Sequence, residues 1–207
     1  MRALDGATVI VWLESAGEVL ASRQDDLTSL DAAIGDGDHG INMSRGFGAL
    51  PAIFAEHTAA PPGSVLKSAG KAILSNVGGA SGALWGVFFR AASKVLGDQP
   101  EVAPEQLVAA LRAGLDSIKA LGASAPGDKT MVDALTPAVE CLESASPPGG
   151  EAFAAAAEAS LLGAASTVPL QARKGRASYL GERSIGHEDP GAASAAIVIR
   201  ALADTVG

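Results

Sequence analysis

Residues 104–121 read PEQLVAALRAGLDSIKAL, and large apolar side chains recur in this stretch every three or four positions. The residues that set this period are Leu107, Leu111, Leu115 and Ile118. The spacing places them on one face of an amphipathic helix. Similar spacing continues along nearly the whole chain, and the two-residue alternation typical of strands is almost absent. The sequence therefore predicts an all-α fold.

Glycines, prolines and polar clusters divide the chain into eight predicted helices. They cover residues 8–22, 41–56, 64–77, 82–97, 104–121, 131–145, 151–168 and 190–206. Most connections are short, which favours antiparallel neighbours and hence an antiparallel up-and-down eight-helix bundle or barrel. A chain of 207 residues can bury a sizeable core, and we expect one domain spanning residues 1–207.

In an up-and-down bundle, every second connection emerges at the same end. The first, third, fifth and seventh connections all place glycine beside charged or hydroxyl side chains. They read LTSLDAAIGDGDHG (residues 27–40), VGGASG (77–82), GASAPGDKT (122–130) and PLQARKGRASYLGERSIGHED (169–189). The remaining connections are ordinary turn sequences. The sequence therefore predicts that a functional site lies at one end of the bundle.

The composition excludes several classes of partner. Fifteen Lys and Arg residues against 23 Asp and Glu residues give a net charge of −8. A field of this sign repels nucleic acid and acidic lipid headgroups, so we expect neither nucleic acid nor a membrane as a partner. Cys141 is the only cysteine, which excludes an intrachain disulfide and a cysteine-rich metal site. Asp5 and Glu14 make the N-terminus a poor signal peptide, and we expect a cytoplasmic protein.

The first polar connection contains three aspartates, Asp31, Asp36 and Asp38. Hard divalent cations prefer carboxylate oxygens and water, and Mg²⁺ is commonly held by a few carboxylates together with phosphate oxygens. The acidic pattern does not fit an EF-hand, and the three histidines lack the paired spacing of a zinc site. Close carboxylates repel one another unless a cation or hydrogen bonds compensate. We therefore interpret the aspartates as a metal site, with an acidic helix cap as the alternative.

Two further connections suggest a phosphate ligand. VGGASG precedes a predicted helix, and a glycine-rich turn at a helix N-terminus offers unpaired N–H groups to a phosphate, with Ser81 as an additional hydroxyl. The seventh connection holds four basic side chains, those of Arg173, Lys174, Arg176 and Arg183. Opposite three aspartates, this cluster is typical of a clamp for metal-bound phosphates. An ordinary turn and a solvated basic loop remain as the alternatives.

The fifth connection, GASAPGDKT, nearly matches a Walker A motif. Asp128 interrupts the spacing before Lys129, and a helix precedes the motif where a P-loop requires a strand. We therefore reject a P-loop NTPase, while Gly122, Lys129 and Thr130 can still line a nucleotide pocket. Together the carboxylates, the glycine turn and the basic connection favour phosphoryl transfer, in which catalysis is mostly positioning and charge stabilisation.

Four segments carry a family resemblance in their order and spacing. They are LDAAIGDGDHGINMSRGF, VGGASGALWGVFF, PGDKTMVDAL and QARKGRASYLGERSIGHEDPGA. From about Trp12 to the end, the chain resembles the nucleotide-binding L subunits of phosphotransferase-dependent dihydroxyacetone kinases. The resemblance implies an antiparallel eight-helix barrel with ADP at one end. It also implies that Asp31, Asp36 and Asp38 coordinate two Mg²⁺ ions that bridge the nucleotide phosphates.

The resemblance further implies a set of nucleotide contacts. These are His39, Gly40, Ile41, Asn42, Ala80, Ser81, Gly122, Met131, Arg176, Asp189, Pro190 and Gly191. Gly122 and Met131 would border the adenine, and Arg176 with residues 189–191 would close the site. Arg176 is the expected catalytic residue.

In the resembled family, ADP or ATP stays bound as a coenzyme. A phosphohistidine on a separate donor subunit, the M subunit, phosphorylates the ADP. The terminal phosphoryl group then passes to dihydroxyacetone on a substrate-binding subunit, the K subunit. The resemblance therefore implies these two partners, and we also expect a homodimer. The alternatives are an ATP-exchanging kinase component for another small ketose or polyol, and a nucleotide-sensing interaction module.

Overall fold

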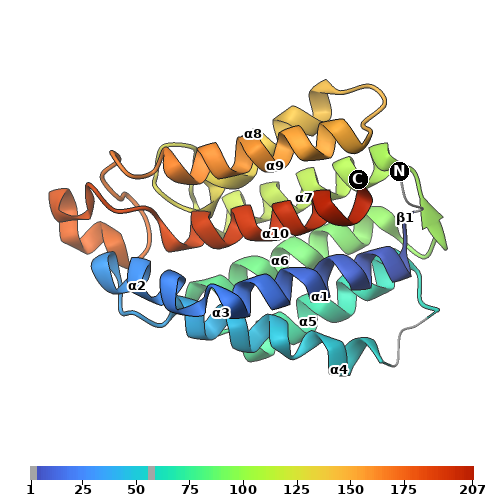
Figure 1. Ribbon diagram of the computed structural model, residues 1–207, viewed down its shortest axis with the longest axis horizontal. Helices are drawn as coiled ribbons and strands as arrows, with labels where there is room; N and C mark the ends of the chain where they lie inside the picture. Colours follow the sequence, from blue (N-terminus) through green and yellow to red (C-terminus); the bar gives the residue numbers. More distant parts are fainter. Residues whose placement is uncertain (1–3, 56–58) are drawn as a thin grey trace.

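The computed structural model describes residues 4–55 and 59–207, most of which are helical (Figure 1). The α-helices are α1 (Gly6–Ser22), α2 (Gln24–Ile34), α3 (His39–Gly48), α4 (Leu50–Phe54), α5 (Pro62–Asn76), α6 (Gly79–Leu96), α7 (Pro104–Gly122), α8 (Met131–Ser144), α9 (Gly150–Ala165) and α10 (Pro190–Val206). A 3-10 helix, η1 (Arg176–Ser184), lies between α9 and α10. Two short strands, β1 (Leu4–Asp5) and β2 (Glu101–Val102), pair antiparallel. The all-α prediction is confirmed.

The long helices lie side by side along the long axis of the molecule and alternate in direction (Figure 1). Helices α5, α6, α7 and α8 are successive neighbours, α9 lies against α8 and α10, and α1 lies between α10 and α5. Helix α3 packs against α1, α2 and α5. The β1–β2 pair and the C-terminus lie at one end of the bundle, whereas α2, η1 and the turn from α5 to α6 lie at the other (Figure 1). Alternate connections therefore gather at one end, as the sequence predicts.

The structure corrects two predicted elements and raises the number of α-helices among the described residues from eight to ten. The prediction of a connection over residues 27–40 is wrong in its first part, because residues 24–34 form α2. A buried polar residue, Asp31, stands on the inner face of α2 and interrupts its apolar pattern. The predicted helix 41–56 divides at Ala49 into α3 and α4, and its predicted end lies outside the described residues.

The core of the bundle contains a cluster of aromatic rings from α1, α3 and α6. Trp85 stacks on Phe89 with 5.5 Å between ring centroids, and Phe47 packs edge-on against both rings. The indole N–H of Trp12 donates a hydrogen bond of 2.9 Å to the Val198 carbonyl, which joins α1 to α10. Buried aromatic side chains remove a large apolar area from water, so this cluster is a main source of stability.

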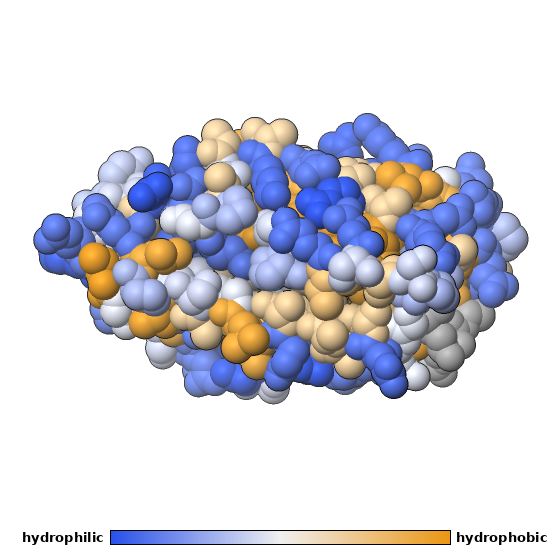
Figure 2. All heavy atoms as spheres, turned by 90° about the horizontal axis from the view of Figure 1, so that it is seen from above, coloured by the Kyte–Doolittle hydropathy of each residue, from blue (hydrophilic) through white to orange (hydrophobic). Residues whose placement is uncertain are grey.

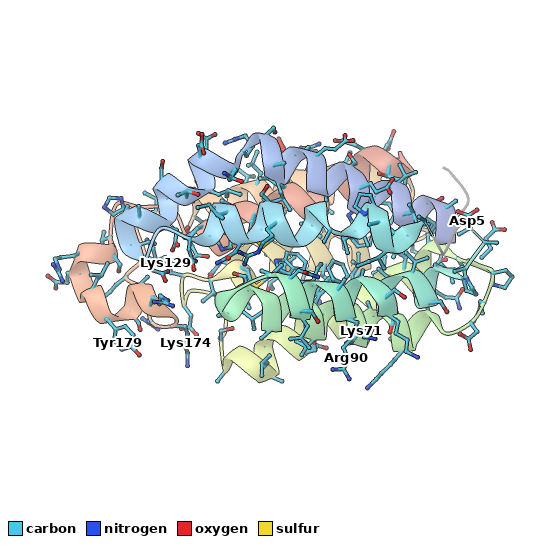
Figure 3. All side chains as sticks on the ribbon, turned by 90° about the horizontal axis from the view of Figure 1, so that it is seen from below. Asp5, Lys71, Arg90, Lys129, Lys174 and Tyr179 are labelled. Carbon is cyan, nitrogen blue, oxygen red and sulfur yellow. The ribbon has the colours of Figure 1, made fainter. Side chains whose placement is uncertain are left out.

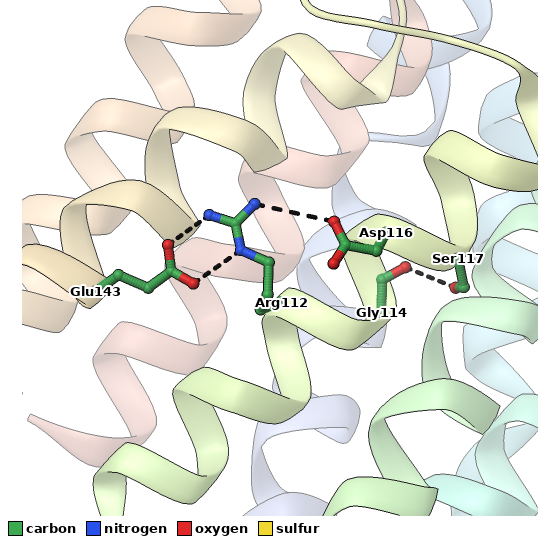
Figure 4. Close-up of polar contacts among 5 residues, drawn as sticks. All are labelled: Arg112, Gly114, Asp116, Ser117 and Glu143. Atoms are coloured by element: carbon green, nitrogen blue, oxygen red, sulfur yellow. Dashed lines mark hydrogen bonds and ion pairs between the residues drawn. The ribbon is translucent and has the colours of Figure 1, made fainter.

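An ion pair joins α7 to α8 on the surface (Figure 4). Arg112 donates from Nε to Glu143 Oε1 at 2.8 Å and from Nη2 to Oε2 at 2.5 Å, and Asp116 lies 4.0 Å from Nη1. The hydrogen bond from Arg112 lowers the pKa of Glu143. Because both partners are partly exposed, the pair contributes only about 0.5–1 kcal/mol to stability.

The outer surface seen from above is mostly hydrophilic, with apolar patches between the polar side chains (Figure 2). Leu161 and Leu162 of α9 are exposed apolar residues, and Cys141 of α8 is a half-buried free thiol. Within residues 4–55 and 59–207, no helix is both long and apolar enough to cross a membrane.

Gly114 of α7 packs directly against α6, and a Cβ at this position would lie 2.6 Å from Phe88 Cδ2. We predict that Gly114→Ala lowers the free energy of unfolding by about 1–3 kcal/mol, because the added methyl group displaces the ring. Gly48→Ala is the matched control, since a Cβ at this helical glycine meets no atom within 4 Å. The control should be neutral or stabilising by about 0.5 kcal/mol. Urea unfolding measures both, and equal stability of Gly114→Ala and the parent chain would contradict the close packing.

Candidate functional site

Three carboxylates meet at the end of the bundle that carries α2 and η1. One oxygen each of Asp31, Asp36 and Asp38 lies within 4.8 Å of the others. Asp31 is buried on α2, whereas Asp36 and Asp38 are exposed in the turn between α2 and α3. Carboxylate oxygens at this spacing suit a hard divalent cation. The structure brings together all three predicted metal ligands.

The Asp31 carboxylate also fixes the start of α3. Its Oδ2 accepts hydrogen bonds from the backbone N–H groups of Asp38 at 2.9 Å and His39 at 3.1 Å. The side chain of Asp38, the N-cap residue of α3, makes no capping hydrogen bond. Of the three aspartates, only Asp31 therefore acts as the acidic helix cap that was the alternative to a metal site. At Gly40, α3 lies directly against α2, because a Cβ there would lie 2.0 Å from the Gln24 carbonyl oxygen. This contact keeps Asp31 beside the acidic turn.

His39 links the starts of three helices through its buried ring. Nε2 lies 2.9 Å from Ser194 Oγ on α10, and Nδ1 lies 3.2 Å from Ser81 Oγ on α6. Ser194 Oγ donates to the Gly191 carbonyl at 3.0 Å, so its oxygen accepts from a protonated Nε2. Nδ1 then accepts from the Ser81 hydroxyl, a tautomer assigned from this network. Burial lowers the pKa of His39 against the opposing effect of the nearby carboxylates, which favours a neutral ring.

The start of α8 lies against the start of α10. Thr130 caps α8, because its Oγ1 accepts from the Val132 N–H at 3.2 Å. The buried Asp133 carboxylate accepts in turn from the Thr130 N–H at 2.8 Å. A Cβ built on Gly191 would lie 3.7 Å from Met131 Cβ, so these two predicted nucleotide contacts are neighbours.

Asp189 caps α10 and is a strongly perturbed acid. Its Oδ2 accepts from the Ala192 N–H at 2.7 Å, and its own N–H donates to Thr167 Oγ1 at 2.9 Å. Burial raises the pKa of Asp189 to about 7, and the Asp133 carboxylate acts in the same direction. The hydrogen bond from Ala192 and the ammonium group of Lys129 oppose this shift. Asp189 therefore titrates near neutral pH.

The basic connection between α9 and α10 folds over the acidic cluster. Arg176 Nη1 lies 2.9 Å from Asp36 Oδ2. Ala172 and Ala177 of this connection pack on Ile34 of α2 in a small apolar cluster. Three other basic residues of the connection form no ion pair within the described part of the chain; they are Arg173, Lys174 and Arg183. The structure therefore brings one of the four predicted basic groups, Arg176, to the carboxylates.

The remaining predicted nucleotide contacts lie on α3, α6, α7 and α10. Asn42 is buried, and its Oδ1 accepts a hydrogen bond of 2.7 Å from Arg45 Nη2. Ile41 and Ala80 are exposed on the first turns of α3 and α6, and Gly122 ends α7. Pro190 is buried in the first turn of α10. All of these residues lie at the end of the bundle where the acidic cluster is found.

The interpretation of Lys129 as a pocket residue is wrong, because its side chain is only 1% exposed and points into the protein. Its Nζ donates to the carbonyl oxygens of Thr167 (2.9 Å), Leu170 (3.1 Å), Ser184 (2.8 Å) and His187 (2.5 Å). Figure 3 shows Lys129 at the same end as Lys174 and Tyr179. Burial lowers the pKa of Lys129, and the Asp189 carboxylate acts against this shift. The Lys129 side chain thus binds the connection between α9 and α10 through its carbonyl groups.

Three residues of the site were missed in the sequence: Ser194, Asp133 and Arg45. Ser194 and Asp133 are polar residues on the buried faces of helices, and this mismatch with the apolar pattern was their only general signal. Asp133 also stands three positions after Thr130, which is the spacing of a capping box. Arg45 lies on an exposed position of α3 and carries no sequence signal.

The chain matches a known protein family over most of its length. The sequence matches the DAK2 domain over residues 33–204. The chain belongs to the DAK2 domain family. This DAK2 domain is 43% identical over 210 residues to the ADP-binding subunit DhaL of the PEP-dependent dihydroxyacetone kinase of Escherichia coli (strain K12), and the alignment covers 97% of each chain.

Other relatives of the DAK2 domain differ in length. The ADP-binding subunit DhaL of PEP-dependent dihydroxyacetone kinase 1 from Listeria innocua is 44% identical over 194 residues, covering 94% of this chain and 93% of that one. D-erythrulose kinase of Mycolicibacterium smegmatis is 40% identical over 198 residues, covering 93% of this chain but only 34% of that protein.

Solved structures of the dihydroxyacetone kinase of C. freundii share the fold. The native form matches with a TM-score of 0.74 and 29% identity over 99% of this chain and 35% of that chain. The complex of that kinase with AMP-PNP and Mg²⁺ matches with a TM-score of 0.73 and 30% identity. The helical bundle of this DAK2 domain thus corresponds to about one third of the longer kinase.

Asp189→Asn tests the titration of the cap of α10, because asparagine keeps a capping side chain but does not ionise. An aspartate in an unfolded chain has a pKa of about 3.9. Since the folded value is about 7, the stability that protonated Asp189 contributes is complete below about pH 4 and is lost as the pH rises through about 7. Relative to the parent chain, the variant should gain about 1–2 kcal/mol of unfolding free energy between about pH 5 and about pH 8, allowing for partial exposure.

The measurement is urea unfolding in EDTA without nucleotide, at several pH values. Asp204→Asn, an exposed change on the same helix, is the control and should leave the pH dependence unaltered. Parallel curves for Asp189→Asn and the parent chain would show that Asp189 is already ionised across this range.

Proposed function

We propose that this DAK2 domain, as one ADP-binding domain over residues 1–207, is the ADP-binding subunit of a phosphoenolpyruvate-dependent dihydroxyacetone kinase. The observation that carries the proposal is the acidic cluster. Asp31, Asp36 and Asp38 meet beside Arg176, in a chain that aligns with a relative named as such a subunit over 97% of each length. A hard-cation site next to a guanidinium suits the phosphate groups of a nucleotide.

In this proposal the three carboxylates hold two Mg²⁺ ions against the phosphates of ADP. Asp31 has Oδ1 left for a cation, because Oδ2 accepts two backbone N–H groups. Asp36 likewise has one oxygen beyond the one paired with Arg176. Bound Mg²⁺ supplies positive charge that neutralises phosphate oxygens during transfer. Arg176, as the catalytic residue, adds a guanidinium that can pair with the transferred phosphoryl group.

The helix starts at this end support a phosphate site as well. Helix α6 begins after Gly78 without a side-chain cap bond, so its first-turn N–H groups are suited to phosphate oxygens. The full set of proposed nucleotide contacts is His39, Gly40, Ile41, Asn42, Ala80, Ser81, Gly122, Met131, Arg176, Asp189, Pro190 and Gly191. The His39 network fixes the backbone at the starts of α3 and α6, and Met131 beside Gly191 forms an apolar border that suits adenine.

The proposed reaction uses two partner subunits in the cytoplasm. A phosphohistidine on the M subunit gives its phosphoryl group to ADP: the P–N bond breaks and a terminal oxygen of ADP forms the new P–O bond. The resulting ATP passes its γ-phosphoryl group to a hydroxyl of dihydroxyacetone on the K subunit. ADP is regenerated in place and acts as a coenzyme. A homodimer of this chain stays a prediction that light scattering would test.

A second candidate function is an ATP-exchanging kinase component for another small ketose. The similarity to D-erythrulose kinase favours it, although this chain covers only 34% of that protein. The two candidates differ in the fate of ADP, which is retained in the first and exchanges with free ATP in the second. A nucleotide-sensing module, which would bind but not transfer, is the third alternative.

Asp36→Asn and Asp38→Asn test the metal ligands, since each keeps the size of the side chain but removes its charge. We predict that each variant loses Mg²⁺-dependent retention of ADP by at least about tenfold, the effect of losing an ion ligand or its supporting group. ADP remaining after gel filtration in Mg²⁺ and in EDTA is the measurement. Asp25→Asn, an exposed aspartate on α2, is the matched control. Full retention in both variants would contradict the metal assignment.

Reconstitution tests the function itself. The purified chain, mixed with donor and substrate-binding subunits, should form dihydroxyacetone phosphate from phosphoenolpyruvate without free ATP. Arg176→Ala should slow this turnover by about 100-fold, the scale of removing one charge-stabilising group. Its free energy of unfolding should change by less than about 1 kcal/mol, because the pair with Asp36 is exposed. Arg183→Ala, on the same connection, is the control.

The donor requirement separates the three candidate functions. Turnover with free ATP but not with phosphoenolpyruvate would favour the exchanging kinase. Nucleotide binding without any transfer from either donor would favour the sensing module.

A further inference from the structure

The connection between α9 and α10 leaves the bundle and returns to it at a narrow base, which we call the neck. The neck consists of residues 167–170 on one side and residues 184–187 on the other. The Gly186 N–H donates to the Val168 carbonyl at 2.8 Å, so the two sides are in direct contact. Helix η1 begins with Arg176 beyond the neck and ends in it at Ser184.

One ammonium group joins the two sides of the neck. Lys129 Nζ donates to Thr167 and Leu170 on one side and to Ser184 and His187 on the other. All four partners are carbonyl oxygens, which only accept hydrogen bonds. An ammonium group has three N–H bonds and no acceptor, so this site fits the charged form of lysine, with one N–H shared.

Lys129 adopts an unfavourable backbone conformation and buries its side chain. Its φ angle is 62°, in the left-handed region that costs a residue with a side chain about 1 kcal/mol. The side chain is also fully buried, which is rare for lysine without such partners. The four hydrogen bonds to the neck are the stabilising interactions that offset both costs.

We infer that Lys129 is a positioning residue, which holds the connection between α9 and α10 so that Arg176 meets the acidic cluster. Its partners belong to the neck, so it acts on Asp36 through η1 and the contact of Ala177 with Ile34. Asp189, which caps α10, lies two residues after the end of the neck. The inference rests on the proposed function, because it names a further residue that the nucleotide site requires.

Lys129→Met tests the inference, because methionine keeps an apolar stem and removes the ammonium group. Four trypsin sites lie in the connection, after Arg173, Lys174, Arg176 and Arg183. We expect cleavage at these sites and release of ADP with Mg²⁺ to be at least about tenfold faster than in the parent chain, since buried carbonyls lose their donor. The helical circular dichroism signal should stay the same.

Two controls separate positioning from loss of a charge or of stability. Lys94→Met removes an exposed lysine of α6 and should behave as the parent chain in both assays. Leu111→Ala removes a buried side chain of α7, a helix that contributes no residue to the neck, and lowers the stability of the bundle. At an equal loss of thermal stability, Leu111→Ala should keep the parent rates of cleavage and ADP release.

Three results would overturn the inference. They are parent rates in Lys129→Met, an equal acceleration in Leu111→Ala, and faster cleavage of Lys129→Met without faster ADP release. If Lys129→Met does not fold, hydrogen exchange on the parent chain decides: the Gly186 amide should exchange at least about tenfold more slowly than the amides of η1. Faster exchange at Gly186 would refute the neck. Cleavage and exchange need no nucleotide, so failure of the parent chain to bind ADP would count against the proposed function alone.

Discussion

A neutral imidazole between two serine hydroxyls is the contact on which the site depends. His39 is the first residue of α3, Ser81 lies in the first turn of α6, and Ser194 lies near the start of α10. One ring therefore holds the N-terminal ends of three helices together. The direction of each bond is determined, because Ser194 already donates to Gly191 and can only accept from the ring. A charged ring would make Nδ1 a donor, so the Ser81 hydroxyl would have to accept from the ring instead of donating to it.

Helix starts with partial positive charge and carboxylates lie together at this end of the bundle. Four helices, α3, α6, α8 and α10, begin there, and the partial positive charge of each helix start faces the polar connections. Carboxylates are distributed over these starts: Asp31 accepts two N–H groups of α3, Asp133 accepts the Thr130 N–H at α8, and Asp189 caps α10. A chain with a net charge of −8 can thus present a local environment that suits both cations and phosphate oxygens.

The sequence was most informative where one side of a helix is uniformly apolar. Helix α7 matches its predicted range to within one residue, because Leu107, Leu111 and Leu115 mark its inner face. Helix α2 was missed because Asp31 occupies a buried position where the period calls for an apolar residue. The spacing of the three aspartates predicted their meeting point, since they lie close in the chain. Pairings over long sequence separations, such as that of Ser194 with His39, depend on how the bundle closes, and no local pattern records them. Lys129 was misjudged because the direction of its side chain follows from a backbone angle that the sequence does not reveal.

The positions of the chain ends have a consequence for how this domain can be joined to others. Leu4, the first described residue, belongs to the β1–β2 pair, and the C-terminus lies at the same end of the bundle, opposite to η1 and the acidic cluster (Figure 1). A polypeptide attached near either of these positions starts from there, well away from the acidic cluster. This arrangement accords with relatives in which a matching segment makes up about one third of a longer kinase. The same geometry allows the domain to be immobilised through a terminal tag with the acidic cluster facing outward.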